Sequence, residues 1–251
     1  MGTSTEVFDR VADDYDRARP RYPAEVFDLL SEVAGGLAGR LIVEGGSGTG
    51  IATRALTARG ARVVAVEPGG EMLRIGASVP GAMPVRADAT ALPVRDCSVD
   101  LCCFAQSWHW LAQPAGSSEA ARVLVDGGHW CAWWSQPAAD GKRWFDGTWE
   151  ILEATFPGVT RDQRDHDWGT TLMDPCFTAP ERRLVRWTRT VTRADWLVEL
   201  GTTSYVAALD PEPRRDLLAE LASLLARVGG DDPLVVPYQT TLWTARRESR
   251  S

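Results

Sequence analysis

The chain has 251 residues, of which 44% are hydrophobic and 24% charged, proportions typical of a soluble globular domain. A chain of this length buries enough apolar surface to fold without staples, so disordered proteins and disulfide-stapled miniproteins are excluded. A formal net charge of −7 disfavours nucleic acid and anionic lipid surfaces as partners. The count of 11 Trp against 4 Tyr and 6 Phe is high and needs an explanation.

The cysteines and the N-terminal residues indicate the cellular compartment of the protein. The five cysteines include no CxxC pair and lie at no zinc-ligand spacing, so we expect reduced thiols and no metal site. No run of about 18 apolar residues occurs. The first residues are acidic and polar, where a signal peptide would be basic and then apolar. These features predict a cytoplasmic protein that does not bind membranes.

Helical and extended patterns alternate through the first half of the chain. Apolar residues at helical spacing predict a helix over residues 23 to 34, with Gly35 as its stop. Further helices are predicted over residues 50 to 59 and around 117 to 125. Apolar runs predict strands at 41 to 44, 62 to 67, 83 to 88, 99 to 105 and 128 to 135. Continuous apolar strands separated by helices indicate a parallel sheet covered on both faces.

The second half has a different pattern. Prolines and glycines between residues 136 and 180 predict an insertion of loops around one helix near Trp144 to Phe156. A strand is predicted over residues 182 to 190, and a capping-box pattern at Thr192 and Asp195 predicts the start of a helix.

The chain ends with a long helix and a strand. Five leucines in one stripe predict a helix that begins at Asp210-Pro211 and stops at Gly229-Gly230. The segment LVVPYQTTLWTARR predicts a final strand, with Pro237 near its start at an edge or bulge position.

The segment Glu44-Gly45-Gly46-Ser47-Gly48-Thr49-Gly50 leads from a predicted strand into a helix. Its glycines Gly46, Gly48 and Gly50 would let a ligand lie against the backbone near a helix start. Alone, such a loop is equally a ligand-free connection. Glu67 ends the next strand 21 residues after Gly46, the spacing at which an acid reaches both hydroxyls of an adenosine ribose.

The residues around these glycines narrow the choice of ligand. Ile51 stands where the dinucleotide fingerprint needs its third glycine, and no GK[ST] sequence follows for a triphosphate. Glu44 would repel a pyrophosphate but would suit an ammonium or sulfonium group. This combination favours S-adenosylmethionine.

At this point the chain resembles the class I S-adenosylmethionine-dependent methyltransferases. VVAVEPGGEML is similar to the family's second motif, ADATALPVRDCSVD to its third, and LVDGGHW to the glycine motif before the fifth strand. The resemblance implies that Glu67 holds the ribose, Met72 packs on the adenine, and Asp88 and the Ala89 amide lie near the base. The cofactor-binding residues it implies are Tyr15, Arg19, Glu44, Gly46, Gly48, Gly50, Glu67, Pro68, Met72, Asp88, Ala89 and Gln106.

Two further segments narrow the resemblance. FDRVADDYDRARPRYP and AQSWHWL are similar to a small-molecule subgroup that includes trans-aconitate-type enzymes. In that subgroup the N-terminal segment folds over the methionine end of the cofactor, where Arg19 could pair with a carboxylate of the cofactor or the acceptor. The alternative is a solvated arginine in a charged stretch. The chain departs from the family pattern at Gly45, where an aliphatic residue is more usual, and at Asp126, where proline is usual.

His109 is the candidate catalytic base. It follows the fourth predicted strand, at the edge where open α/β sheets bind ligands, and an imidazole pKa near 6.5 suits proton removal. The alternative is a structural imidazole held between two tryptophans. Most Trp residues lie between 108 and 168, and we expect an aromatic acceptor pocket lined by Trp108, Trp110, Trp134, Trp144 and Trp168. The alternative for these residues is core filling.

The resemblance implies an α/β fold: a single Rossmann-like domain with a seven-stranded, mostly parallel sheet that ends in an antiparallel strand. Residues 1–36 would form an N-terminal helical cap segment and residues 37–135 the cofactor-binding core. The 136–180 insertion and the helices of 192–230 would cap the acceptor.

The predicted function is methyl transfer from S-adenosylmethionine to a small, aromatic or partly apolar metabolite on oxygen, nitrogen or carbon. S-adenosylhomocysteine would be the product, and the setting small-molecule metabolism or natural-product biosynthesis. No metal is required, and we expect a monomer or homodimer. Two alternatives stay open: a tRNA or protein methyltransferase, and a non-methylating S-adenosylmethionine-binding protein.

Overall fold

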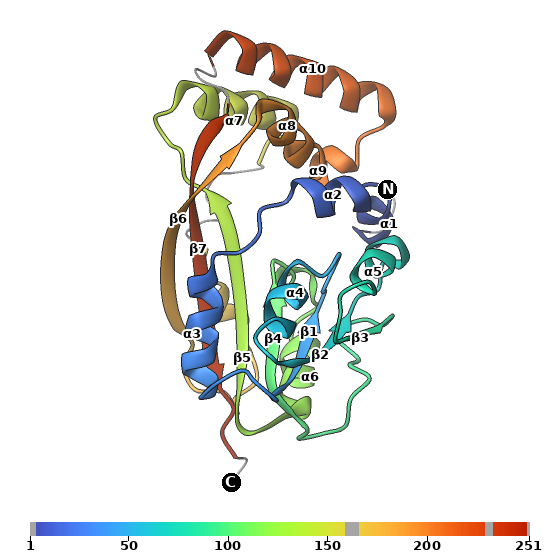
Figure 1. The fold of residues 1–251 in the computed structure, drawn as a ribbon, viewed down its shortest axis with the longest axis vertical. Coiled ribbons are helices and arrows are strands. Elements are labelled where there is room, and N and C mark those ends of the chain that lie inside the picture. Colours follow the sequence, from blue (N-terminus) through green and yellow to red (C-terminus); the bar gives the residue numbers. More distant parts are fainter. Residues whose placement is uncertain (1–3, 159–165, 229–232, 250–251) are drawn as a thin grey trace. The chain divides into compact units, whose positions relative to one another are not determined.

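The computed structural model describes residues 4–158, 166–228 and 233–249. Its strands form a seven-stranded sheet in the order β3-β2-β1-β4-β5-β7-β6 (Figure 1). The chain divides into two compact units, which are described separately. Unit 1 comprises Met1–Pro20, Gln136–His166 and Arg186–Gln239, and unit 2 comprises Arg21–Ser135, Asp167–Val185 and Thr240–Ser251.

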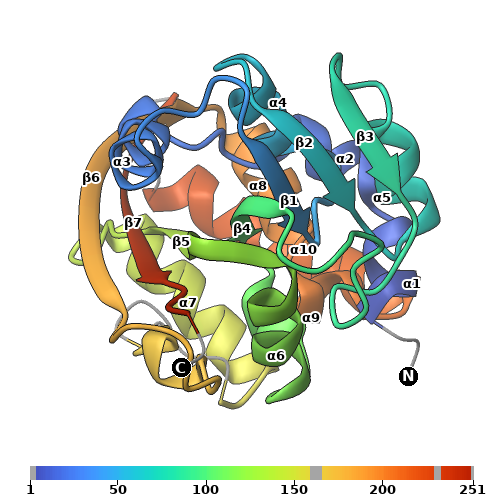
Figure 2. The ribbon, with the colours of Figure 1, turned by 90° about the horizontal axis from the view of Figure 1, so that it is seen from below.

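Unit 2 contains the parallel part of the sheet. β1 (Leu41–Gly45) pairs with β2 (Arg62–Val66) and β4 (Val99–Ala105), while β3 (Ala82–Val85) pairs with β2 and β5 (Leu124–Pro137) with β4, all parallel. Figure 2 shows β1, β2 and β3 side by side. The inner strands are almost wholly buried, as their continuous apolar runs predict.

Helices of unit 2 cover both faces of these strands. They are α3 (Ala24–Ala34), α4 (Ile51–Thr57), α5 (Gly70–Gly76) and α6 (Ala115–Val123), with short 3-10 helices η1 (Trp108–Trp110) and η3 (Trp168–Thr171). The alternation of β5 shows the two faces: Trp133 packs against Phe27 of α3, whereas Trp130 clusters with Ala120 of α6. Figure 2 shows α3 and α6 on opposite sides of β5. The predicted Rossmann-like arrangement is confirmed.

β7 (Leu234–Arg246) is antiparallel to β5 and lies between β5 and β6 (Glu181–Val191). At one end the Gly127 N–H donates to the Arg247 carbonyl, and at the other the Ser135 and Thr240 hydroxyls are bonded, so the two strands run in opposite directions. β7 is therefore not an edge strand, and the edge position expected for Pro237 is wrong. The proline still accepts the Ala138 N–H through its carbonyl, so the ladder loses only one donor.

Unit 1 is mainly helical. Its helices are α1 (Ser4–Asp9), α2 (Ala12–Ala18), α7 (Arg143–Thr155), α8 (Arg193–Gly201), α9 (Ser204–Ala207) and α10 (Pro211–Val228). The predicted leucine stripe of α10 lies in an apolar core with α7 and α8, through Leu217, Leu221 and Leu225. The Thr192 hydroxyl caps α8 by accepting the Asp195 N–H at 3.0 Å, as the capping box predicts. The predicted stop of α10 at Gly229 lies outside the described residues.

The boundaries of the two units differ from those of the predicted segments, whose capping roles stay predictions. The 1–36 segment divides after Pro20, because α3 packs on β5 in unit 2, where its Phe27 ring lies 6.2 Å from that of Trp133. The 136–180 insertion divides after His166, and Trp168 stacks on Trp134 of β5. The amino-acid composition predicted both segments, but it could not show which of the two units each part of a segment would pack in.

All five cysteines are free thiols, and four of them are buried. In the described part of the chain, no helix is both long and apolar enough to cross a membrane.

The end of β1 explains why Gly45 departs from the aliphatic residue expected there. A Cβ at this position would lie 2.5 Å from Cε1 of Phe104 and 3.1 Å from Cβ of Ala89. The Phe104 ring is itself fully buried and packs on Trp108. The aromatic ring of β4 therefore occupies the space that a side chain on β1 would fill.

We predict that Gly45→Ala lowers the free energy of unfolding by about 1–3 kcal/mol, because overpacking forces the Phe104 ring or the backbone to move. Urea unfolding measures this difference. Gly70→Ala is the matched control, since its new methyl would meet only the flexible end of Arg86 at 3.6 Å. Adding Phe104→Leu to Gly45→Ala should recover part of the loss. Equal stability of Gly45→Ala and the wild type would contradict this packing argument.

Candidate functional site

The glycine loop after β1 needs its glycines for conformation. Gly46, Gly48 and Gly50 have φ values of 68°, 57° and 82°, in the left-handed region that strains other residues. A Cβ on Gly46 would also lie 2.5 Å from Cβ of Ser107 at the end of β4. The three predicted loop glycines therefore allow a turn that would strain other residues, and at Gly46 and Gly50 a side chain would also collide with its neighbours.

Two hydroxyls of this loop are buried without a protein partner. The side chains of Ser47 and Thr49 are 6% and 1% exposed, and neither hydroxyl makes a hydrogen bond within the described structure. A buried hydroxyl left without a partner costs about 1–3 kcal/mol. The loop therefore fits a polar ligand that supplies these bonds. Met72 lies beside it, because a Cβ on Gly48 would be 3.4 Å from the Met72 methyl group.

Glu67 ties the glycine loop to the turn after β2. Its Oε2 accepts the Gly48 N–H at 2.9 Å and its Oε1 accepts the Gly69 N–H at 2.8 Å. The side chain is 9% exposed. Its carboxylate is thus held in a fixed orientation at the carboxyl edge of the sheet, where the sequence predicts a ribose ligand. The next residue, Pro68, accepts a bond from Arg86 through its carbonyl.

Glu44 is deeply buried at the end of β1. It is 1% exposed, and its Oε2 accepts the Thr53 hydroxyl of α4 at 2.5 Å. Burial raises the pKa of the Glu44 carboxyl to about 8, the Thr53 bond opposes this shift, and the nearby Glu67 charge adds to it. The carboxyl is therefore mostly neutral at pH 7 in the structure described. Its predicted attraction for a cation stays a prediction.

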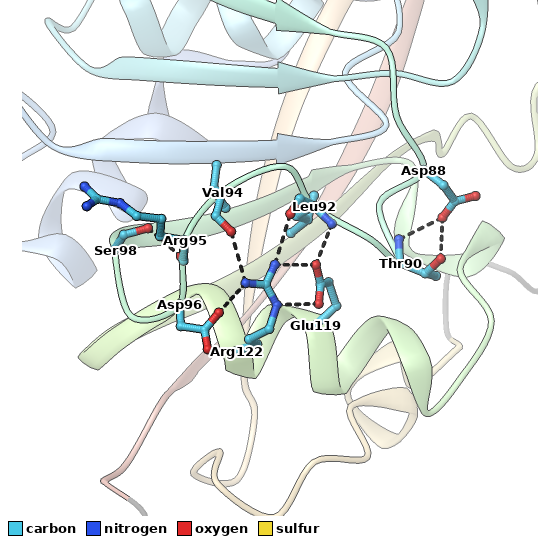
Figure 3. A network of polar contacts seen from close by, with 9 residues as sticks. All are labelled: Asp88, Thr90, Leu92, Val94, Arg95, Asp96, Ser98, Glu119 and Arg122. Atoms are coloured by element: carbon cyan, nitrogen blue, oxygen red, sulfur yellow. Dashed lines mark hydrogen bonds and ion pairs between the residues drawn. The ribbon is translucent and has the colours of Figure 1, made fainter.

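The loop after β3 carries Asp88 and Ala89. Oδ1 of Asp88 accepts both the N–H and the hydroxyl of Thr90, at 2.7 and 2.6 Å, in a local turn (Figure 3). Asp88 is exposed, whereas Ala89 is 6% exposed. The loop therefore presents the Asp88 carboxylate in a set orientation.

The Arg122 side chain of α6 holds the loop after β3. The sequence did not predict this role. All five guanidinium N–H groups are used (Figure 3). Two donate to the Glu119 carboxylate, two to the carbonyls of Leu92 and Val94, and one to Asp96. Glu119 in turn accepts the Leu92 N–H. Bonds to Glu119 and Asp96 raise the pKa of Arg122 further above its ordinary value.

The end of β4 lies directly against the glycine loop. The Ser107 hydroxyl donates to the Gly45 carbonyl at 2.6 Å. Gln106 has an uncommon φ of 58°, and its N–H donates to the Trp133 carbonyl while its side chain bonds the Ser135 carbonyl. A non-glycine residue in this conformation is typical of functional sites.

His109 lies in an aromatic cluster, defined here as His109, Trp110, Trp134 and Trp168. The Trp134 indole Nε1–H donates to Nδ1 of His109 at 3.1 Å. Trp134 and Trp168 stack with centroids 4.8 Å apart, and the His109 ring lies 5.5 Å from Trp168 and 4.7 Å from Trp110. His109 keeps an exposed face, and the surrounding rings lower the pKa of its imidazole to about 4 by desolvating the charged form.

Two predicted pocket residues lie elsewhere. Trp108 is 1% exposed, packs on Phe104 and Trp130, and donates its indole N–H to the Thr171 hydroxyl at 2.8 Å. Trp144 lies in the core of unit 1, where its ring meets Trp196 edge-on at 5.5 Å. Both are core residues in the structure, the alternative that the sequence left open.

Tyr15 and Arg19 belong to unit 1. The Arg19 guanidinium donates from Nε to the Thr202 hydroxyl and from a terminal nitrogen to the Thr202 carbonyl, both at 3.0 Å. It also lies 5.0 Å above the Tyr15 ring. The structure brings these two predicted residues together and fixes Arg19 on Thr202, while their contacts with a cofactor stay a prediction.

Several residues of the site carry weak sequence signals. Ser47 and Thr49 stand inside the glycine loop, but burial without a partner cannot be read from their positions. Ser107 follows a predicted strand and could have been suspected from that place alone. Arg122 has no signal, because its partners come from a loop that lies some 26 to 30 residues earlier.

Comparison with known proteins identifies the family. A family model described as a methyltransferase domain matches residues 43–132. An uncharacterized methyltransferase of Mycobacterium tuberculosis is 33% identical over 230 residues, which cover 90% of this chain and 89% of the relative. A methyltransferase-like protein of Schizosaccharomyces pombe is 27% identical, with 94% and 93% covered. The chain belongs to the class I methyltransferase family.

Solved structures share the fold. A proposed type II methyltransferase from Anaeromyxobacter dehalogenans superposes with a TM-score of 0.65 at 24% identity, covering 92% of this chain and 97% of that one. The Haemonchus contortus phosphoethanolamine N-methyltransferase 2 gives a TM-score of 0.53 at 13% identity, covering 98% of this chain and 58% of that one. That enzyme was solved with S-adenosyl-L-methionine. The narrower trans-aconitate-type resemblance stays a prediction.

We predict that Glu44→Gln removes a pH-dependent loss of stability. The pKa of Glu44 rises from 4.5 to about 8 on folding. The contribution of this side chain to the free energy of unfolding is therefore fully present below pH 4.5 and is lost as the pH rises through 8. The wild type should lose up to about 5 kcal/mol relative to Glu44→Gln across this window. Urea unfolding at pH 5 and pH 8.5 measures the difference. Parallel pH dependence in both proteins would contradict the buried neutral acid.

We predict that Arg122→Lys lowers the free energy of unfolding by about 1–3 kcal/mol, because an ammonium cannot reproduce the five bonds of the guanidinium. Hydrogen exchange should accelerate more in residues 88–98 than in β1 and β2, which exchange only through global opening. Arg74→Lys is the control, since Arg74 makes an exposed ion pair with Glu71, worth about 0–1 kcal/mol. Equal effects of the two substitutions would show that Arg122 does not organise the loop.

Proposed function

We propose that the chain binds S-adenosylmethionine at the glycine loop and methylates a small, partly apolar acceptor, with an aromatic acceptor favoured. One observation carries the cofactor assignment: the hydroxyls of Ser47 and Thr49 are buried without partners in a loop that also contacts the Glu67 carboxylate. Buried hydroxyls need hydrogen-bond partners. A ligand with several hydrogen-bonding groups can supply them, whereas a purely apolar ligand cannot.

Each residue around the loop has a role in this proposal. Gly46 and Gly48 let the methionine part of the ligand approach the backbone, Glu67 accepts the ribose hydroxyls, and Met72 packs on the adenine. Asp88 and the Ala89 amide face the polar edge of the base. When bound, the cofactor supplies a methyl group on a sulfonium. The thioether released on transfer is a good leaving group.

Solved neighbours support the choice of cofactor. The Haemonchus contortus enzyme was crystallised once with S-adenosylhomocysteine and once with S-adenosyl-L-methionine. Its sequence is only 13% identical to this chain, so the comparison supports the fold that binds this cofactor and leaves the acceptor open.

The aromatic cluster supports a flat, partly apolar acceptor. Trp134 and Trp168 are nearly parallel, with an interplanar angle of 16°, and Trp110 is 49% exposed. The exposed Trp110 indole offers a π face to an aromatic ring or a cation. Trp134, which is 5% exposed and stacked on Trp168, helps to exclude water from a transfer step. The formal charge of −7 speaks against a tRNA substrate.

We predict that Glu67→Ala weakens S-adenosylhomocysteine binding by about tenfold to a hundredfold, as charge-assisted hydrogen bonds are lost and the loop is freed from the Gly48 bond. Isothermal titration calorimetry measures both proteins. Glu71→Ala, an exposed acid in the first turn of α5 that is paired with Arg74, is the control and should bind like the wild type. Unchanged affinity of Glu67→Ala would contradict the ribose assignment.

Turnover separates the remaining classes of function. Incubation of S-adenosylmethionine with a library of aromatic and aliphatic acceptors should release S-adenosylhomocysteine with at least one small acceptor. Release with tRNA or peptides alone would instead assign a macromolecular substrate. Tight cofactor binding with no release for any acceptor would point to a non-methylating binder, and absence of binding would remove all three.

A further inference from the structure

His109 is held in one protonation and tautomeric state by its neighbour. An indole nitrogen can only donate a hydrogen bond, so the 3.1 Å contact from Trp134 Nε1 requires a lone pair on Nδ1 of His109. A neutral imidazole carries one proton, which must then lie on Nε2. The surrounding rings keep the imidazole neutral, since they lower its pKa.

This state leaves no nitrogen for a base. Nδ1 has a lone pair, but the Trp134 indole occupies it, and Nε2 already carries its proton. Among the described residues, no hydrogen bond from Nε2 is found. The ring therefore keeps one group without a partner among the described residues, an Nε2–H donor on an exposed residue beside Trp110 and Trp168.

We infer that His109 is a fixed hydrogen-bond donor that orients the methyl acceptor through Nε2–H, with its tautomer set by the Trp134 indole. The ligand class is a flat acceptor that carries an oxygen or nitrogen lone pair next to its apolar part. This inference rests on the proposed function, and it replaces the base role expected for His109. The acceptor atom then attacks with its own lone pair, and any proton it carries leaves to water.

The tautomer can be tested without any acceptor. Two-bond 1H–15N correlation spectra of 15N-labelled protein distinguish Nδ1–H from Nε2–H, and loss of one signal set in His129→Gln and in His166→Gln assigns the three histidines. We expect the Nε2–H form for His109 in the wild type and a mixture of both tautomers in Trp134→Phe. An Nδ1–H form in the wild type overturns the inference, whatever the chain methylates.

The donor role is tested with isosteric variants. His109→Gln can place an amide N–H near the Nε2 position and cannot act as a base, whereas His109→Asn reaches only the Nδ1 position. With an acceptor that the wild type methylates, we expect His109→Gln to stay within about threefold in kcat/KM. His109→Ala and His109→Asn should lose about tenfold, the size of one neutral hydrogen bond, mainly as a higher acceptor KM.

The outcomes separate this inference from the proposed function. Losses of about a hundredfold or more in kcat for both His109→Gln and His109→Ala would restore the base role and overturn the donor role. Unchanged kinetics in His109→Ala would also overturn it. In either case, intact S-adenosylhomocysteine affinity of the variants would leave the methyltransferase assignment standing. No cofactor binding by the wild type would remove that assignment, and the donor role toward an acceptor with it.

Discussion

The site depends on the close approach of β1 and β4 at the carboxyl edge of the sheet. Gly45 and Gly46 lack side chains, and their space is filled by the Phe104 ring and by Ser107. The Ser107 hydroxyl also binds the Gly45 carbonyl, so the two strand ends are joined by packing and by a hydrogen bond. Because the ends of parallel strands meet at one edge, this contact places the glycine loop beside the segment that continues to His109.

The parallel core could be predicted because its signals are local. Continuous apolar runs marked β1, β2 and β4 within about one residue of their observed bounds, since a strand buried on both faces needs apolar side chains throughout. β5 begins at Leu124, earlier than predicted, although Gly127 and Gly128 favour a turn. Both glycines bond to Arg247, a partner more than a hundred residues away that a local pattern cannot reveal.

The position of β7 shows the same limit. Pro237 favours an edge on local grounds, yet the strand is inserted between β5 and β6. Strand order depends on which distant segments pair, and the proline restricts only its own N–H. The fold class was therefore predictable from the sequence and its family resemblance, whereas the neighbours of the last strand come from the structure alone.

In the candidate site, backbone requirements were easier to predict than side-chain directions. The loop glycines follow from conformation alone, whereas the tryptophans had to be sorted by the structure. Trp108 and Trp110 are two residues apart in η1, so they point in different directions: Trp108 enters the core and Trp110 stays 49% exposed. Burial of Trp108 and Trp144 accounts for part of the Trp excess, and the aromatic cluster accounts for another part.

Desolvation links the two titratable groups of greatest interest. It raises the pKa of Glu44 to about 8 and lowers that of His109 to about 4, so both are neutral or mostly neutral at pH 7. A bound cation would affect the protonation states of these two groups differently. A cation near the loop would favour the charged form of Glu44 and release its proton, because opposite charge offsets the cost of burial. The same cation would hold His109 more firmly in its neutral form. Occupancy of the loop is therefore coupled to the protonation of Glu44, while His109 keeps its donor N–H in either state.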